Sequence, residues 1–167
     1  MATWQFDIHA LPSIAVERLC VGTPMSISPG DFNNSEWWAG IQIPTNFRDD
    51  FGKLLPRMSS WSLQLEQWGY EDGNRIDVVW EGAEIVEVFV RLDVRALSSV
   101  FLVGTLELAR KNRWAFRASN GIVFRPSMAR LLAEIHKSDA FRFIEDPCAF
   151  LSELEQARRI EVPKDTT

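Results

Sequence analysis

The most regular alternation of apolar and polar residues lies in the middle of the chain. Ile76, Val78 and Trp80 alternate with mostly charged neighbours, and after a short turn at residues 81–83 the alternation continues over residues 86–94. A period of two places the two sets of side chains on opposite faces of a strand. The pattern therefore predicts a long β-hairpin with one apolar face and one largely charged face.

Other elements follow from the same kind of pattern. Alternation predicts strands over residues 3–10 and 114–118, and the Asn120-Gly121 pair predicts a tight turn into a return strand at 122–124. Helices are expected where apolar residues recur every three or four positions behind a residue whose side chain can cap a helix. These helices start behind Thr45, Ser98 (over 99–111), Ser127 and Asp146 (to about 159).

Several segments are less determined. Residues 13–21 are ambiguous, with Ser13 as a possible helix cap, and residues 60–68 fit both a strand and a helix. Residues 22–36, rich in Gly, Pro, Ser and Asn, are expected to form a long surface loop. The tail at 163–167 is expected to fray.

The order of these elements predicts the fold class. The chain of 167 residues has the length of one domain, and no repeat or linker divides it. Strands joined by tight turns are antiparallel, and helices between them cover a sheet face. We expect a single globular α+β domain over residues 1–167, with a mostly antiparallel sheet of about five to six strands covered by helices on one face.

Composition narrows the function. The net charge is −5 and the isoelectric point about 5.1, which argues against nucleic-acid binding. No stretch has the apolar length of a membrane span or a signal peptide, so a cytoplasmic location without membrane contact is expected. Cys20 and Cys148 lie far apart and are expected to be two buried thiols in a reducing compartment.

Motifs for catalysis and for cofactors are lacking. His9 and His136 are the two histidines, and neither belongs to a nucleophile or metalloprotease motif. No phosphate-binding glycine loop occurs, and the run from Asp72 lacks the acidic residue that closes a calcium loop at Ala83. We therefore expect a protein that is not an enzyme and binds no cofactor or metal.

An acidic cluster is expected on the charged face of the hairpin. Asp77, Glu87 and Asp93 share this face with three arginines. The arginines are Arg75, Arg91 and Arg95. A ladder of cross-strand ion pairs accounts for all six residues, and if a partner covers the face, the same charges set its specificity.

The adjacent pair Trp37-Trp38 is the most suggestive feature for an exposed surface. It follows a polar stretch that contains Asp31 and Glu36. Consecutive residues of an extended chain point in opposite directions. One tryptophan then anchors the loop while the other lines a surface groove; in the alternative, both pin the loop to the core.

Several segments of the chain resemble those of known proteins. Trp37-Trp38, Trp68-Gly69 and the segments 72–78, 88–95 and 138–147 resemble a group of small bacterial proteins, over most of residues 31–151. That group resembles the immunity proteins of bacterial polymorphic-toxin systems. The resemblance implies a protein-binding module that inhibits a cognate toxin by covering its active site.

Acidity, tryptophan content and the missing catalytic motifs agree with a basic protein partner. The candidate partner-binding residues are Asp31, Glu36, Trp37, Trp38, Asp77, Glu87 and Asp93. Two alternatives stay open. One is a small-molecule-binding or enzymatic domain with a tryptophan-lined pocket between sheet and helices, and the other is a self-associating subunit that forms a homo-oligomer.

Overall fold

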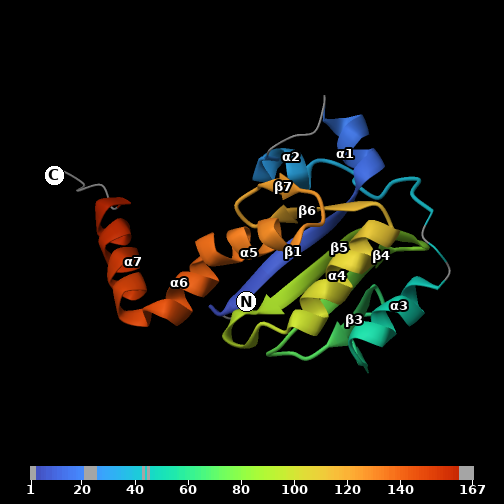
Figure 1. The fold of residues 1–167 in the computed structure, drawn as a ribbon. Coiled ribbons are helices and arrows are strands. Elements are labelled where there is room, and N and C mark those ends of the chain that lie inside the picture. Colours follow the sequence, from blue (N-terminus) through green and yellow to red (C-terminus); the bar gives the residue numbers. More distant parts are fainter. Residues whose placement is uncertain (1–2, 21–25, 43, 45, 162–167) are drawn as a thin grey trace.

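The fold is built on one antiparallel sheet (Figure 1). A computed structural model describes residues 3–20, 26–42, 44 and 46–161, with side chains of the last helix described through Leu154. Within this part the sheet has seven strands, in the spatial order β2-β3-β4-β5-β1-β6-β7. The strands are β1 Gln5–Pro12, β2 Arg57–Met58, β3 Leu65–Gly69, β4 Arg75–Glu81, β5 Glu84–Asp93, β6 Trp114–Ala118 and β7 Val123–Phe124. The α+β class is confirmed, with slightly more strands than expected.

The helices begin largely where capping residues predict them. Ser98 and Ser127 accept hydrogen bonds from Phe101 and Arg130 backbone nitrogens, and Asp146 accepts one from that of Ala149. The helices are α1 Ser13–Leu19, α2 Pro29–Asn33, α3 Phe47–Leu54, the short 3-10 helix η1 Val94–Ala96, α4 Ser99–Lys111, α5 Met128–Lys137, α6 Asp139–Glu145 and α7 Pro147–Glu161.

The inner face of the sheet holds the aromatic core. Trp68 of β3 and Trp114 of β6 project from this face toward α3, whose Phe51 lies 5.0 Å and 6.4 Å from them between ring centroids. Phe47 of α3 adds contacts to Trp68 and to Trp80 of β4. These tilted and edge-on ring pairs belong to the buried hydrophobic cluster of the fold.

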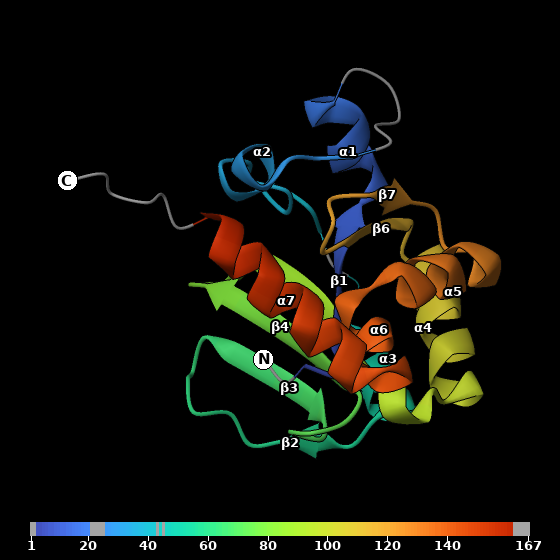
Figure 2. The ribbon, with the colours of Figure 1, turned by 90° about the vertical axis from the view of Figure 1, so that its left-hand side faces the viewer.

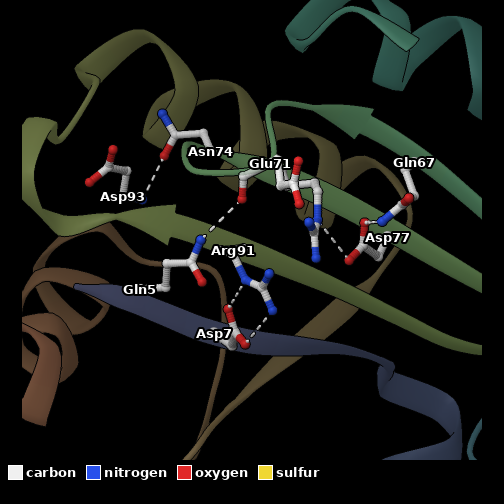
Figure 3. Close-up of polar contacts among 9 residues, drawn as sticks. Gln5, Asp7, Gln67, Glu71, Asn74, Asp77, Arg91 and Asp93 are labelled. Atoms are coloured by element: carbon white, nitrogen blue, oxygen red, sulfur yellow. Dashed lines mark hydrogen bonds and ion pairs between the residues drawn. The ribbon is translucent and has the colours of Figure 1, made fainter. Parts of the chain in front are cut away.

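The outer face is covered over part of its width. Figure 1 shows α1 and α2 together beside β6 and β7, away from α3. From α2, Phe32 reaches the outer side of β6, where it lies over Arg117. The outer face of β3, β4 and β5 carries a polar network instead of a helix layer (Figure 3).

The C-terminal helices lead away from the sheet. Figure 1 shows α6 and α7 leaving the body of the molecule, and Figure 2 shows α7 from the side on which it lies. Phe150 of α7 is buried, with its ring edge toward Phe143 of α6. The sequence pattern did not predict α6. No helix in the described residues is long and apolar enough to cross a membrane.

Several local expectations are corrected. Residues 13–19 are helical, but Ser13 is the first helical residue and provides no cap. Of the segment 60–68, the part from Leu65 is strand. The expected loop at 22–36 contains α2, capped by Ser28. Thr45, residues 22–25 and the tail at 163–167 lie outside the described residues.

Two burial expectations also change. Ile85 is buried and Val86 exposed, the reverse of the predicted alternation, because the register shifts between Val79 and Trp80. Both cysteines are free, as the spacing suggested, but Cys148 is exposed and Cys20 only partly buried. The expectation of two buried thiols is therefore wrong.

Candidate functional site

Trp37 and Trp38 are both buried, each 4% exposed, which agrees with the alternative in which both pin the loop to the core. They flank one end of the sheet. Trp37 stacks on Phe32 of the outer side at 6.0 Å and donates its indole N–H to the Phe32 carbonyl. Trp38 meets the inner-facing Trp114 edge-on at 5.6 Å. The pair thus pins the segment that passes around the end of the sheet, and both residues also line a surface hollow.

We call this depression, of about 360 Å³, the acidic hollow. It lies between the segment after α2 and the tip of the β4–β5 hairpin. All of its charged lining residues are glutamates. Its lining comprises Phe32, Asn33, Ser35, Glu36, Trp37, Trp38, Ala39, Glu81, Glu84, Ile85, Val86 and Glu87. The structure therefore brings together four of the candidate residues, Glu36, Trp37, Trp38 and Glu87.

The glutamates of the acidic hollow are short of counter-charges. Glu81 and Glu84 lie directly opposite each other across the turn at Gly82. Along with Glu36, they form no ion pair with any residue that the structure describes. Only Glu87 has a basic neighbour, with Oε1 2.9 Å from Nδ1 of His9, a close contact that lacks hydrogen-bond geometry. Like charges held opposite each other cost stability, so they point to a use beyond folding.

A larger depression of about 870 Å³ adjoins the acidic hollow. It shares Trp38, Glu84 and Ile85 with that hollow and continues along Trp80 toward Arg48 of α3. Arg48 stacks over Trp80 and pairs with Glu66. We call it the tryptophan hollow. The two together form a groove around the hairpin tip, open to solvent.

The expected ladder of ion pairs between β4 and β5 is wrong, because the register places Arg75 opposite Arg91 and Asp77 opposite Phe89. Arg91 pairs instead with Asp7 of β1, with Nε to Oδ1 at 2.9 Å and Nη2 to Oδ2 at 3.2 Å (Figure 3). The remaining arginines pair along their own chain segment, Arg75 with Asp77 and Arg95 with Asp93.

Asp77 is the most buried of the candidate carboxylates, 1% exposed. Its Oδ1 accepts a hydrogen bond from Gln67 Nε2 at 2.9 Å, and its Oδ2 accepts one from Arg75 Nε at 3.0 Å. Burial raises the pKa of Asp77, against the opposing effect of these two donors. Asp77 therefore has fixed partners within the sheet and does not line the acidic hollow.

Asp93 and Asp31 also lie apart from the acidic hollow. Asp93 binds both Nε and Nη2 of Arg95, and these hydrogen bonds lower its pKa. Asp31 is exposed in α2, where it accepts a hydrogen bond from the Ser28 hydroxyl. Both carboxylates therefore have local structural partners.

Sequence reasoning missed Glu81, Glu84 and Val86 as members of the site. The available signal was their position at the hairpin turn, where two glutamates separated by two residues must face each other. Nothing in the sequence indicated that Glu36 lies beside them.

The described part of the chain assembles no metal-binding group. No set of three or more His, Cys, Asp or Glu side chains in it is arranged to hold a metal ion. His136 stacks on Phe141, and His9 lies between Glu87 and Phe32. No family model, curated protein or solved structure matches this chain.

Proposed function

We propose that this chain is a protein-binding module whose acidic hollow receives basic side chains of a partner. The observation that carries the proposal is the set of unpaired glutamates around a partly apolar depression, with Glu81 directly opposite Glu84. A lysine or arginine of a partner placed between them relieves their repulsion and gains charge-assisted hydrogen bonds.

The apolar part of the acidic hollow suits the same partner. Val86 is exposed beside the glutamates, and Trp37 and Trp38 form part of the wall. Long basic side chains bury an aliphatic stem against such surfaces while the charged group meets carboxylates. The net charge of −5 adds long-range attraction for a basic protein and speeds its encounter.

The narrower form of the proposal is an immunity-type inhibitor. The resemblance of residues 31–151 to immunity proteins supports it, together with the acidic binding surface. In this proposal the partner is a basic bacterial toxin, and the chain inhibits it by covering the active site. Basic residues that bind the toxin's own substrate are then the residues that the acidic hollow receives.

The experiment is co-purification of the tagged chain from its host, with the partner identified by mass spectrometry. Binding of that partner is then measured for wild type and for the double variant Glu81→Lys, Glu84→Lys. We expect the double variant to weaken binding at least about tenfold, or about 1.4 kcal/mol, and to lessen its dependence on salt.

The matched control is Glu107→Lys, at an exposed glutamate on α4 that forms no ion pair with the residues described. It changes the net charge by the same amount per residue and is expected to leave the affinity within about twofold. The lack of any stoichiometric partner, or equal affinity of the double variant and wild type, contradicts the protein-binding proposal. A partner without toxic activity contradicts only its immunity form.

The tryptophan hollow supports a second candidate, binding of a small molecule. Its volume of about 870 Å³ is in the range of ligand sites, and Trp38, Phe47 and Trp80 line it. A thermal-shift screen of metabolites tests this candidate. A ligand whose effect disappears in Trp80→Leu but persists in Glu81→Lys would favour it over the protein-binding proposal.

A further inference from the structure

A third depression, chemically unlike the acidic hollow, lies on the outer face of β3, β4 and β5. It has a volume of about 490 Å³. We call it the arginine hollow, after Arg75 in its floor. Its lining comprises Met58, Ser59, Trp61, Leu65, Gln67, Glu71, Arg75, Asp77, Val79 and Phe89. It shares no residue with the acidic hollow, so it can be tested separately.

Two arginines are forced together beside this hollow. Arg75 lies directly opposite Arg91 in the pairing of β4 with β5. Arg91 also lies 5.8 Å from the centroid of Phe89, measured from its guanidinium carbon, so it borders the floor. Like charges directly opposite each other destabilise a sheet unless other groups compensate them.

The carboxylates beside these two arginines use only part of their hydrogen-bond donors. Asp77 binds Arg75 through Nε alone, which occupies one of the five guanidinium N–H groups and leaves the four on Nη1 and Nη2. Asp7 binds Arg91 through Nε and Nη2, which leaves Nη1 unbound. Neither arginine side chain forms a further hydrogen bond within the described part of the chain. Donors of both arginines are therefore free on the outer face.

Partial burial strengthens the interaction of these arginines with a ligand. The side chains of Arg75 and Arg91 are only 14% and 12% exposed. An anion bound at such a site is screened less than at an open surface. Asp77 does not compete for the free side of Arg75, because Gln67 holds its other oxygen within the floor.

The other lining residues indicate the shape and charge of the ligand beyond its carboxylate. Leu65, Val79 and Phe89 form an apolar surface next to Arg75, and Trp61 lies at the mouth, 89% exposed. A tryptophan that is almost fully exposed beside a hollow gains contact area when a flat or apolar group enters. Glu71 in the lining repels negative charge, so a ligand with a single carboxylate is less disfavoured there than one with two.

We propose that the arginine hollow binds a monocarboxylate with an aromatic or branched aliphatic body. The carboxylate accepts hydrogen bonds from the free Nη groups of Arg75, with Arg91 close by. The body lies on Val79 and Phe89, and Trp61 covers it from the mouth. Such a carboxylate is carried by a free aryl acid or by the last residue of a peptide.

Binding is tested by NMR, following the Arg Nε–H and Trp indole N–H signals during titration. Phenylacetate and N-acetylphenylalanyl-phenylalanine represent the two sources, and the corresponding amides serve as neutral controls. We expect a dissociation constant of about 0.1–10 mM for at least one acid, as for a small ligand held by few contacts. Binding at least about tenfold weaker is expected for its amide. The tighter acid identifies the source.

Three variants locate the site. Arg75→Gln with Asp77→Asn removes both charges, so that Asp77 is not left buried without a partner, and is expected to weaken binding at least about tenfold. Trp61→Ser, in an exposed loop, is expected to weaken it about three- to tenfold. Arg18→Gln, an exposed arginine of α1, is the control and is expected to bind as wild type does.

Three outcomes overturn the proposal. They are no binding of either acid at about 10 mM, equal binding of acid and amide, and an unchanged affinity in a folded double variant. If the double variant does not fold, two other measurements test the proposal. They are the affinity of Trp61→Ser and the shift of the Trp61 indole signal when the acid is added to the wild type. Failure here leaves the protein-binding proposal untouched, because the acidic hollow lies elsewhere.

Discussion

The guanidinium carbon of Arg117 lies 4.3 Å from the centroid of the Phe32 ring, and this contact joins α2 to the outer face of β6. Arg117 is buried, and its Nε and Nη2 both donate to the carbonyl oxygen of Ile27. Among the residues described, no carboxylate pairs with it. Burial lowers its pKa. The aromatic face is thus a main compensation for a cation in the interior.

Phe32→Ala is expected to destabilise the chain by about 2–3 kcal/mol, because it removes both apolar contacts and the cation–π contact. Urea unfolding followed by tryptophan fluorescence measures the loss. Phe32→Tyr, which keeps the ring face, is the control and is expected to lose less than about 1 kcal/mol. Equal stability of the alanine variant and wild type would show that Arg117 does not depend on Phe32.

Replacement of either glutamate at the hairpin tip is expected to raise stability while it weakens partner binding. Glu84→Lys turns the repulsion with Glu81 into an attraction, and a gain of about 0.2–1 kcal/mol follows. Urea unfolding at low and high salt measures it, and the gain is expected to shrink as salt screens the pair. Glu107→Lys is the control. A loss of stability in Glu84→Lys would contradict the inferred repulsion.

Local signals predicted the fold well, because their causes lie within a few residues. The hydroxyl of Ser98 bonds the backbone of Phe101, three residues away, so the sequence itself contains the start of α4. The alternation of Ile76 with Asp77 likewise fixes the two faces of β4. The exchange of Ile85 and Val86 was missed because a register shift depends on both strands at once.

The candidate site was predicted only in part, because it is assembled from distant segments. Glu36 and Glu87 were named from their local surroundings, and no pattern linked them. For Trp37 and Trp38 the sequence left two alternatives open, because their burial depends on contacts with the distant Trp114 as well as with Phe32. Charge spacing alone also suggested pairs between β4 and β5 that the register does not allow.

Asp93 is expected to stabilise the fold at neutral pH and to lose that effect in acid. The hydrogen bonds from Arg95 lower its pKa below the ordinary value of 3.8. The unfolded chain therefore takes up the proton first, and the stabilisation is present above 3.8 and lost as pH falls through the folded value. Asp93→Asn is expected to be less stable than wild type at pH 7, with a difference that shrinks below pH 3.8. A constant difference in urea unfolding across that range would contradict this.

Asp77 is expected to show the opposite dependence. Burial raises its pKa above 3.8, so the folded chain holds this proton more tightly than the unfolded chain. Its contribution to stability is then present below 3.8 and is lost as pH rises through the folded value. Relative to wild type, Asp77→Asn is expected to become more stable with rising pH above 3.8. Urea unfolding of both proteins at several pH values measures this trend, and a falling relative stability would contradict it.

Gly69 sets the close turn that brings β3 back as β4 and so places Arg75. Its φ is +120°, a conformation that side chains rarely adopt, and a Cβ there would lie 2.1 Å from the carbonyl oxygen of Asn74. That oxygen is backbone and accepts the hydrogen bond from the Tyr70 nitrogen, so it cannot move without breaking the turn. Gly69→Ala is expected to cost about 3 kcal/mol or more.

The control for this substitution is Gly52→Ala in the exposed part of α3. A Cβ at Gly52 would meet no atom within 4 Å, and its backbone is helical. Alanine there restricts the unfolded chain and favours the helix, so a gain of about 0.5–1 kcal/mol is expected. Urea unfolding of the two variants should thus show shifts of opposite sign. If Gly69→Ala unfolded at the same urea concentration as wild type, the close approach of Gly69 to Asn74 would not be what holds this turn.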